Sequence, residues 1–99
     1  MTYKLVITEE YEEKLGKFLK KHPDLIDRYF YTMSLLETNP YHNSLRFHKL
    51  KGNLKGLYSI SINDKYRITI EFLLDDKELI PIDLSNHFYD WKLKKNRWN

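Results

Sequence analysis

The sequence contains no cysteine, and it has only three glycines and three prolines in 99 residues. Without cysteine there are no disulfides and no thiolate metal ligands, so a reducing cytosol is the simplest location. No apolar run approaches the ~20 residues that a membrane-spanning helix requires. The opening stretch MTYKLVIT also lacks the basic segment and apolar core of a signal peptide. We therefore expect a small soluble protein of the cytoplasm with no membrane partner.

Several motifs of catalysis and ligand binding are missing as well. The four histidines lack the His-x-x-x-His spacing of zinc sites. The chain has no Gly-rich phosphate loop, no Gly-x-Ser-x-Gly motif and no evident pair of catalytic carboxylates. Gly52 and Gly56 are explained better by a turn than by a nucleotide loop. We expect no metal and no other cofactor.

The composition that remains is that of one folded domain. Hydrophobic residues make up 41% of the chain and charged residues 31%, which is too apolar for disorder. A chain of this length can bury one core but not two, so we expect a single domain over residues 1–99. The net charge is +3, with basic residues concentrated between Arg46 and Lys55 and over residues 92–97. Such a surface favours a polyanion or an acidic protein as the partner.

The first forty residues predict one strand and two helices. Residues 3–8 alternate as a strand does, and Thr8 is placed to cap the helix that follows. The pair His22-Pro23 ends this helix. Asp24 is the expected cap of a second helix, which Asn39-Pro40 ends. The short break between two amphipathic helices predicts an antiparallel helical hairpin.

After Pro40 the hydrophobic period changes from 3.6 to 2, which predicts strands. Leu57–Ile62 and Tyr66–Phe72 form a hairpin around the turn residues Asn63-Asp64. Glu78–Leu84 is expected to be a further strand, with its inward side chains at Ile80, Ile82 and Leu84. The fold class is therefore α+β: a strand, a helical hairpin and an antiparallel run of strands, with the helices on one face of the sheet. The other face is expected to be open for chemistry.

Strand parity places a possible site on that open face. Arg67 lies opposite the apolar face, and so do Thr69, Glu71 and Asp83. If the last strand continues past Leu84, Ser85 and His87 share the polar face. The alternative is that Arg67 is a solvated residue paired with Glu71 or Asp83, and that His87 only caps a strand end.

Several cations and one imidazole surround the predicted hairpin, at positions where formation of the sheet does not require a charged residue. His48, Lys49, Lys51 and Lys55 precede its first strand or lie at the bend, and Arg67 lies in its second strand. Together they suggest a surface that handles phosphate. His22 and His42 lie beside helix ends and prolines, where we interpret both as structural or incidental.

The segment from His48 to Phe72 carries a family resemblance. It begins HKLKGNLKGLYSISINDKYRI, and it is followed by an acidic turn, by IPIDL and by Asn-His-Phe-Tyr. In this order the motifs resemble the RelE/ParE toxin superfamily of toxin–antitoxin modules, most closely the RelE/StbE, YafQ and HigB-like mRNA interferases. The resemblance covers the whole chain, and the RelE-like fold that it implies agrees with the periodicity.

The resemblance also implies a function and partners. The expected protein is the toxin of a type II toxin–antitoxin module, an endoribonuclease that inhibits translation by cleaving mRNA on the ribosome without a metal. Its partners are a cognate antitoxin protein, the ribosome and mRNA. Contact with DNA is expected only through a toxin–antitoxin repressor complex.

Site residues follow from the resemblance position by position. His48 matches the histidine ahead of the Leu-Lys-Gly motif, an acid–base candidate, and Lys51 matches the lysine of that motif. Arg67 matches the strand arginine that acts on the scissile phosphate, and His87 matches the C-terminal catalytic histidine. Residues expected to bind RNA are Arg46, Lys49, Lys55 and Tyr66.

The chain also departs from its apparent relatives. Ser61 stands where YafQ-like chains have another catalytic histidine, and Ser85-Asn86 replaces an Asp-Tyr pair of HigB-like chains. These departures suggest the second of three alternatives that stay open. The first is a ParE-like inhibitor of DNA gyrase with the same fold, the second is an inactive homologue that only binds antitoxin, and the third is a non-catalytic RNA-binding domain.

Overall fold

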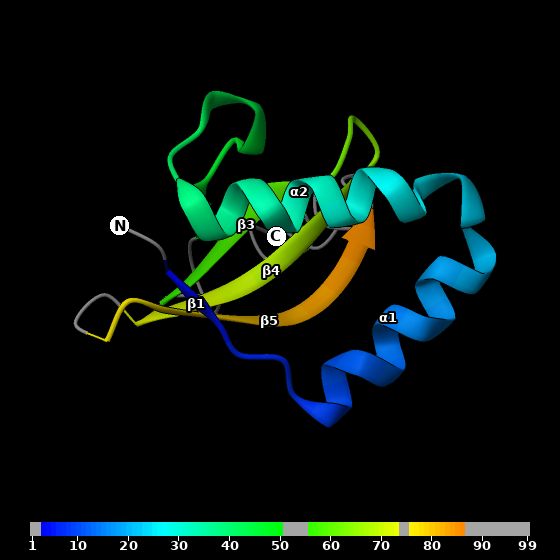
Figure 1. Cartoon of the computed structure of the whole chain (residues 1–99), viewed down its shortest axis with the longest axis horizontal. Coiled ribbons are helices and arrows are strands. Elements are labelled where there is room, and N and C mark those ends of the chain that lie inside the picture. The colour runs from blue at the N-terminus through cyan, green and yellow to red at the C-terminus, as the bar shows by residue number, and fades with distance from the viewer. Residues whose placement is uncertain (1–2, 51–55, 74–75, 87–99) are drawn as a thin grey trace, which may run out of the picture.

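The structure is a computed structural model that describes residues 3–50, 56–73 and 76–86 (Figure 1). Its two long helices separate a first short strand from the rest of one sheet. In chain order the elements are β1 (Lys4–Leu5), α1 (Glu9–Lys21), the 3₁₀ turn η1 (Pro23–Leu25), α2 (Ile26–Thr38), the 3₁₀ turn η2 (Asn43–Leu45), β2 (His48–Lys49), β3 (Leu57–Ser61), β4 (Tyr66–Leu73) and β5 (Glu78–Asn86).

The five strands form one sheet in the order β1-β5-β4-β3-β2. Neighbouring strands are antiparallel except for β1, which runs parallel to β5 with Lys4 opposite Glu78. The predicted α+β fold is confirmed, and the sheet is mixed because of this one parallel pair. The first strand is shorter than the predicted residues 3–8, although the amide of Val6 still donates to the carbonyl of Leu79.

Helix α1 begins and ends where the sequence predicts. The hydroxyl of Thr8 accepts a hydrogen bond from the amide of Tyr11 at 3.1 Å, and the amide of His22 donates to the carbonyl of Phe18. Acidic side chains lie in the first turn and lysines in the last, which suits the helix dipole. The predicted cap of the second helix is wrong: Asp24 lies inside η1, and Leu25 occupies the N-cap of α2 without a side-chain bond. Pro23 starts this turn early because its fixed φ suits a first helical position.

The hairpin of β3 and β4 is confirmed around its predicted turn. The side-chain oxygen of Asn63 accepts hydrogen bonds from the amides of Lys65 and Tyr66, both at 2.9 Å. The amide of Ile62 donates to the carbonyl of Tyr66 and closes the loop. Asn is favoured in such turns because its side chain can bond to the backbone two or three residues on.

The side chains of β5 alternate differently from the prediction. Leu79 and Pro81 are buried, whereas Ile80 and Ile82 are only half-buried, so the expected inward set is wrong for those two isoleucines. The register shifts between Thr69 and Ile70 of the neighbouring strand, which places one extra residue in β5. Because of the extra residue, the side chains that point to the core are odd-numbered before the bulge and even-numbered after it. Leu84, beyond the bulge, does pack against the core as predicted.

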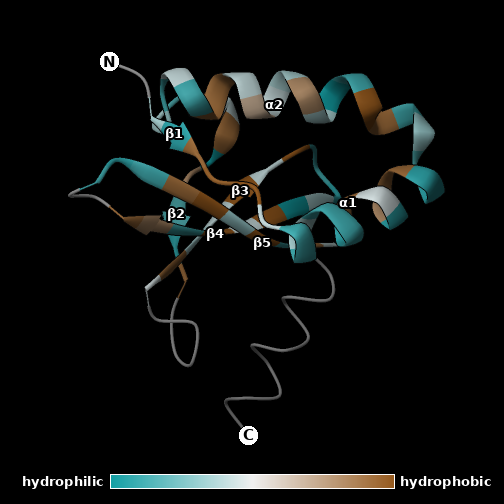
Figure 2. Ribbon diagram, turned by 60° about the horizontal axis from the view of Figure 1, so that its bottom comes forward, coloured by the Kyte–Doolittle hydropathy of each residue, from teal (hydrophilic) through white to brown (hydrophobic). Residues whose placement is uncertain are grey.

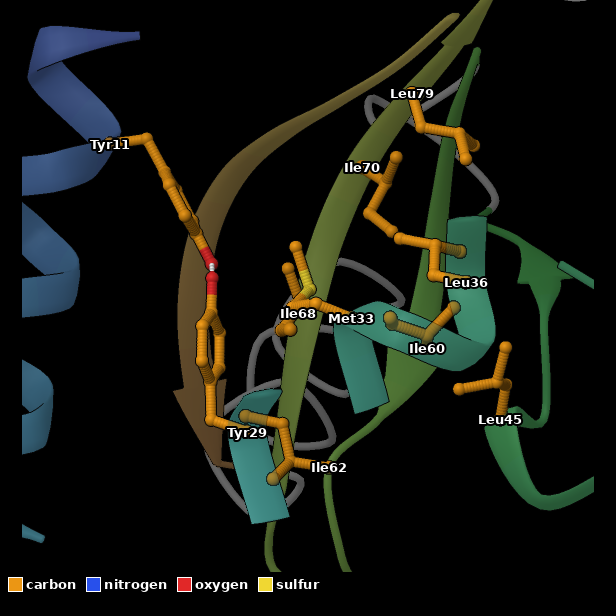
Figure 3. Close-up of a cluster of buried hydrophobic side chains, with 10 residues drawn as sticks. All are labelled: Tyr11, Tyr29, Met33, Leu36, Leu45, Ile60, Ile62, Ile68, Ile70 and Leu79. Carbon is orange, nitrogen blue, oxygen red and sulfur yellow. Dashed lines mark hydrogen bonds between the residues drawn. The ribbon is translucent and has the colours of Figure 1, made fainter. Parts of the chain in front are cut away.

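The core lies between α2 and the sheet, while α1 packs along β5 (Figures 1 and 2). Its buried side chains come from both helices, from η2 and from β3, β4 and β5 (Figure 3). They are Tyr11, Tyr29, Met33, Leu36, Leu45, Ile60, Ile62, Ile68, Ile70 and Leu79. Neither helix of the described chain is long and apolar enough to cross a membrane.

Two tyrosines join the helices through their hydroxyl groups inside this core. The hydroxyl oxygens of Tyr11 on α1 and Tyr29 on α2 lie 3.0 Å apart, and both side chains are almost fully buried (Figure 3). Burial raises the pKa of Tyr11 far above its ordinary value, and the neighbouring Tyr29 raises it further. Burial also raises the pKa of Tyr29. Both hydroxyls therefore stay neutral, and each satisfies the other.

We expect Tyr11→Phe to lower the free energy of unfolding by about 1–3 kcal/mol, because it leaves the Tyr29 hydroxyl buried without this partner. Urea denaturation should show that the double variant with Tyr29→Phe costs less than the sum of the two single changes. The wild type should also lose stability as the pH rises above about 10, since only the unfolded tyrosines ionise there. Strictly additive costs would contradict this account.

Candidate functional site

The sheet face away from α2 carries the polar residues of three strands. His48 on β2 lies opposite Ser59 on β3, and Ser59 lies opposite Thr69 on β4. Residues that pair directly across neighbouring strands point to the same face. These residues therefore make one polar row across the sheet.

A second row lies two residues further along the strands. Arg67 on β4 lies between Ser61 on β3 and Ser85 on β5. Arg67 is only 6% exposed, and Ser59 and Ser61 are buried with it. The expectation that this face is open is therefore wrong at these three residues. All three lie on inner strands, each with a neighbouring strand on both sides.

The imidazole of His48 is exposed, and one hydrogen bond fixes its orientation. Its Nδ1 lies 2.7 Å from the backbone oxygen of Arg46. A carbonyl oxygen can only accept, so Nδ1 must carry the proton and donate it. Nε2 is then the ring atom left for proton transfer.

Arg46 makes this arrangement possible through its backbone. It adopts a left-handed conformation with φ 51° and ψ 45° at the end of η2. This conformation is uncommon for residues other than glycine, and such strain occurs often near functional sites. Its guanidinium lies 3.8 Å from Asp64, but both side chains are exposed and the pair adds little stability.

His48 and Arg67 lie on the same face of the sheet. They are two strands and two residues apart, which corresponds to roughly 12 Å between their Cα atoms. The arrangement offers a cation and an oriented imidazole on one side of the sheet.

Solved structures of other proteins share this architecture. YafQ from E. coli strain BL21(DE3) superimposes with a TM-score of 0.70 at 17% identity, over 88% of this chain and 96% of that one. The YoeB/ParE toxin from Agrobacterium tumefaciens gives 0.65 at 19% identity, over 85% and 98%. The archaeal RelE–RelB complex from Pyrococcus horikoshii OT3 gives 0.66 at 22% identity, over 87% and 96%.

The chain has the fold of the RelE/ParE toxin superfamily. No protein-family model and no curated protein sequence matches it, so the likeness is one of structure. The predicted RelE-like fold is thereby confirmed.

The other predicted site residues lie at different places on this RelE/ParE fold. Lys49 is exposed and lies opposite Tyr58, on the other face of the sheet from His48. Tyr66 also faces away from Arg67, its neighbour in sequence, and its ring packs 4.7 Å from that of His22. Lys51, Lys55 and His87 lie outside the described residues. β5 continues past Leu84, the end of the predicted strand, and reaches Asn86.

Two histidines have structural contacts, as the sequence predicts. The Nδ1 atom of His42 accepts a hydrogen bond from the amide of Ser44 and so caps η2. His22 lies between the rings of Phe18 and Tyr66 at the end of α1. Within the described ranges, no group of three His, Asp or Glu side chains could hold a metal.

Asp83 illustrates how the bulge redirects side chains of the RelE/ParE sheet. The predicted alternative pairs it with Arg67, but its carboxylate lies 3.8 Å from the ammonium of Lys14 on α1. Lys14 also donates to the carbonyl of Ile82, the bulge residue, at 3.3 Å. The carboxylate is therefore directed to the helix.

The lysines of α1 that lie beside Tyr66 carry no functional signal in the sequence. Neither does Ser59, whose hydroxyl is buried without a hydrogen-bond partner among the described residues. Serine in a strand carries no signal of burial, and lysine in a helix is ordinary. Only their placement beside Arg67 and Tyr66 singles them out.

Proposed function

We propose that the protein is the toxin of a type II toxin–antitoxin pair, and that it cleaves mRNA on the ribosome. The observation that carries the proposal is Arg67, a cation buried in the middle of the sheet, on the same face as the oriented imidazole of His48. The RelE/ParE fold supports the proposal, since the solved relatives include a toxin in complex with its antitoxin, E. coli DinJ–YafQ.

The proposed reaction uses the nucleophile that RNA itself carries. The ribose 2′-oxygen loses its proton to a base and attacks the adjacent phosphorus, and the bond to the 5′-oxygen breaks as an acid protonates that oxygen. The products are a 2′,3′-cyclic phosphate and a 5′-hydroxyl, so neither water nor a metal enters this step. DNA lacks the 2′-hydroxyl and is not cleaved.

The residues divide between charge stabilisation and proton transfer. Arg67 offers planar paired donors to the phosphate oxygens, whose negative charge grows in the transition state. His48 presents Nε2 for one of the two proton transfers. The family resemblance gives Lys51 a second contact to the phosphate and His87 the other proton transfer.

The proposed partners follow from the same chemistry. Because the proposed site is basic, we expect the antitoxin to inhibit it by covering it with an acidic segment. The ribosome supplies the positioned mRNA, and Arg46, Lys49 and Lys55 are assigned to RNA binding.

Induction of the chain alone in a bacterial host tests this proposal. We expect growth arrest and new mRNA 5′ ends inside coding regions when transcripts are mapped by primer extension. Co-expression of the antitoxin gene adjacent to this one should restore growth. Intact transcripts together with DNA damage would instead identify a gyrase inhibitor, and unimpaired growth would identify an inactive homologue.

A further inference from the structure

A basic groove lies between α1 and the final residues of β5. Its volume is about 370 Å³, and its walls include Lys14, Lys17 and Lys21 on one side and Tyr66, Ser85 and Asn86 on the other. Among the described residues, β1 pairs only with the first residues of β5, so the outer edge of β5 beyond them, on the side away from β4, faces α1.

The three lysines lie on one face of α1 and are unequally neutralised. Lys14 already contacts Asp83 and the carbonyl of Ile82. Lys17 and Lys21 form no ion pair with any described residue, although Glu13 is one turn from Lys17. Lys17 and Lys21 are like charges four residues apart on the helix, and such charges repel each other.

An aromatic wall closes one side of the groove. The ring of Tyr66 lies 5.3 Å from that of Phe18 and 4.7 Å from that of His22, which hold it in place. Proteins that bind single-stranded nucleic acid combine a positive groove for the backbone with aromatic rings for the bases. The groove has both features.

The groove reaches the proposed catalytic face at Ser85. Ser85 lines the groove and pairs directly with Arg67, whereas Tyr66 borders the groove from the opposite face of the sheet. Lys14 to Lys21 spans about 10 Å of helix, which gives room for more than one phosphate.

We propose that the groove binds the mRNA strand where it leaves the scissile phosphate, with Lys17 and Lys21 on its phosphates and Tyr66 against a base. The inference rests on the proposed function, because it takes Arg67 to mark the scissile phosphate. Its ligand is the phosphate chain of single-stranded RNA, and it assigns a binding role to α1.

The test measures binding without cleavage. A 12-nucleotide 2′-O-methyl oligouridine has no free 2′-hydroxyl, so its binding to the full-length chain can be followed by fluorescence anisotropy at several salt concentrations. The variant Lys17→Gln/Lys21→Gln should reduce the slope of log affinity against log salt by about 1.4, since each phosphate contact to a single strand contributes about 0.7. The matched control Lys4→Gln/Lys20→Gln removes the same charge from exposed positions outside the groove and should leave the slope unchanged.

Each outcome decides between partners. If the two double variants gave equal slopes of log affinity against log salt, the groove would not be the RNA-binding site, whether or not the wild type cleaves RNA. Suppose that the variant Lys17→Gln/Lys21→Gln loses binding to poly-glutamate but binds the oligouridine as the wild type does. The groove would then bind an acidic protein partner and not RNA. A reduced slope in a chain that never cleaves mRNA would support the groove while the proposed function fails, so the two failures are distinguishable.

Discussion

Arg67→Met should reduce mRNA cleavage by about 10²–10³-fold, the loss seen when one stabilising donor of a transition-state charge is removed. Methionine retains the unbranched apolar stem that fills this buried position, so the fold should persist. The rate of cleavage on ribosomes programmed with a defined mRNA measures the effect, and circular dichroism confirms folding. Arg67→Lys should lose nearly as much activity, because an ammonium cannot reproduce the planar paired donors.

Arg28→Met is the matched control for this experiment. The Nε atom of Arg28 donates to the carbonyl of Ile62 at 2.8 Å, and its guanidinium lies over the ring of Tyr31, with no place on the proposed catalytic face. The control removes the same charge and should cleave mRNA at the wild-type rate. A folded Arg67→Met variant with undiminished cleavage would remove Arg67 from the mechanism.

His48→Asn should reduce cleavage by about 10²-fold or more while leaving stability nearly unchanged. The asparagine amide can replace Nδ1 as the donor to the carbonyl of Arg46, but it has nothing to replace Nε2. The pH–rate profile should lose one limb in the variant, which a purely structural role would not cause. His48→Ala removes both functions and should also weaken the left-handed turn at Arg46.

His42→Asn provides the comparison for His48. His42 is also exposed, and its Nδ1 also contacts a residue two positions away, but it lies outside the polar rows of the sheet. Its replacement should change neither the rate nor the pH profile. If His48→Asn behaved in the same way, proton transfer would have to be assigned elsewhere.

Sequence alone predicted the elements whose signals are local. Thr8 and the His22-Pro23 pair define α1, and Asn63 defines the turn between β3 and β4, because caps and turns depend on residues a few positions apart. The bulge in β5 could not be predicted in this way. It depends on how Ile82 fits beside Thr69 and Lys14, which are distant in sequence.

The same distinction applies to the site. Strand parity placed Arg67, Ser85 and the polar face of β4 together, and the register confirms that placement. Parity could not show that Arg67 is buried, because burial depends on the neighbouring strands. Nor could it relate His48 to Arg67, since β2 has two residues and no alternation to detect. The roles of Lys51, Lys55 and His87 remain predictions of the resemblance alone.

The parallel pairing of β1 with β5 joins strands that are far apart in the chain, so the sheet is completed late in synthesis. β1 leaves the ribosome first during synthesis, but its partner Glu78 lies near the other end of the described chain. Contacts between residues so far apart in sequence form late and slowly. The nascent chain therefore cannot close its sheet, or place Ser85 beside Arg67, until most of it has emerged. If the proposed function holds, the nascent chain cannot cleave the mRNA that encodes it before its sheet has closed.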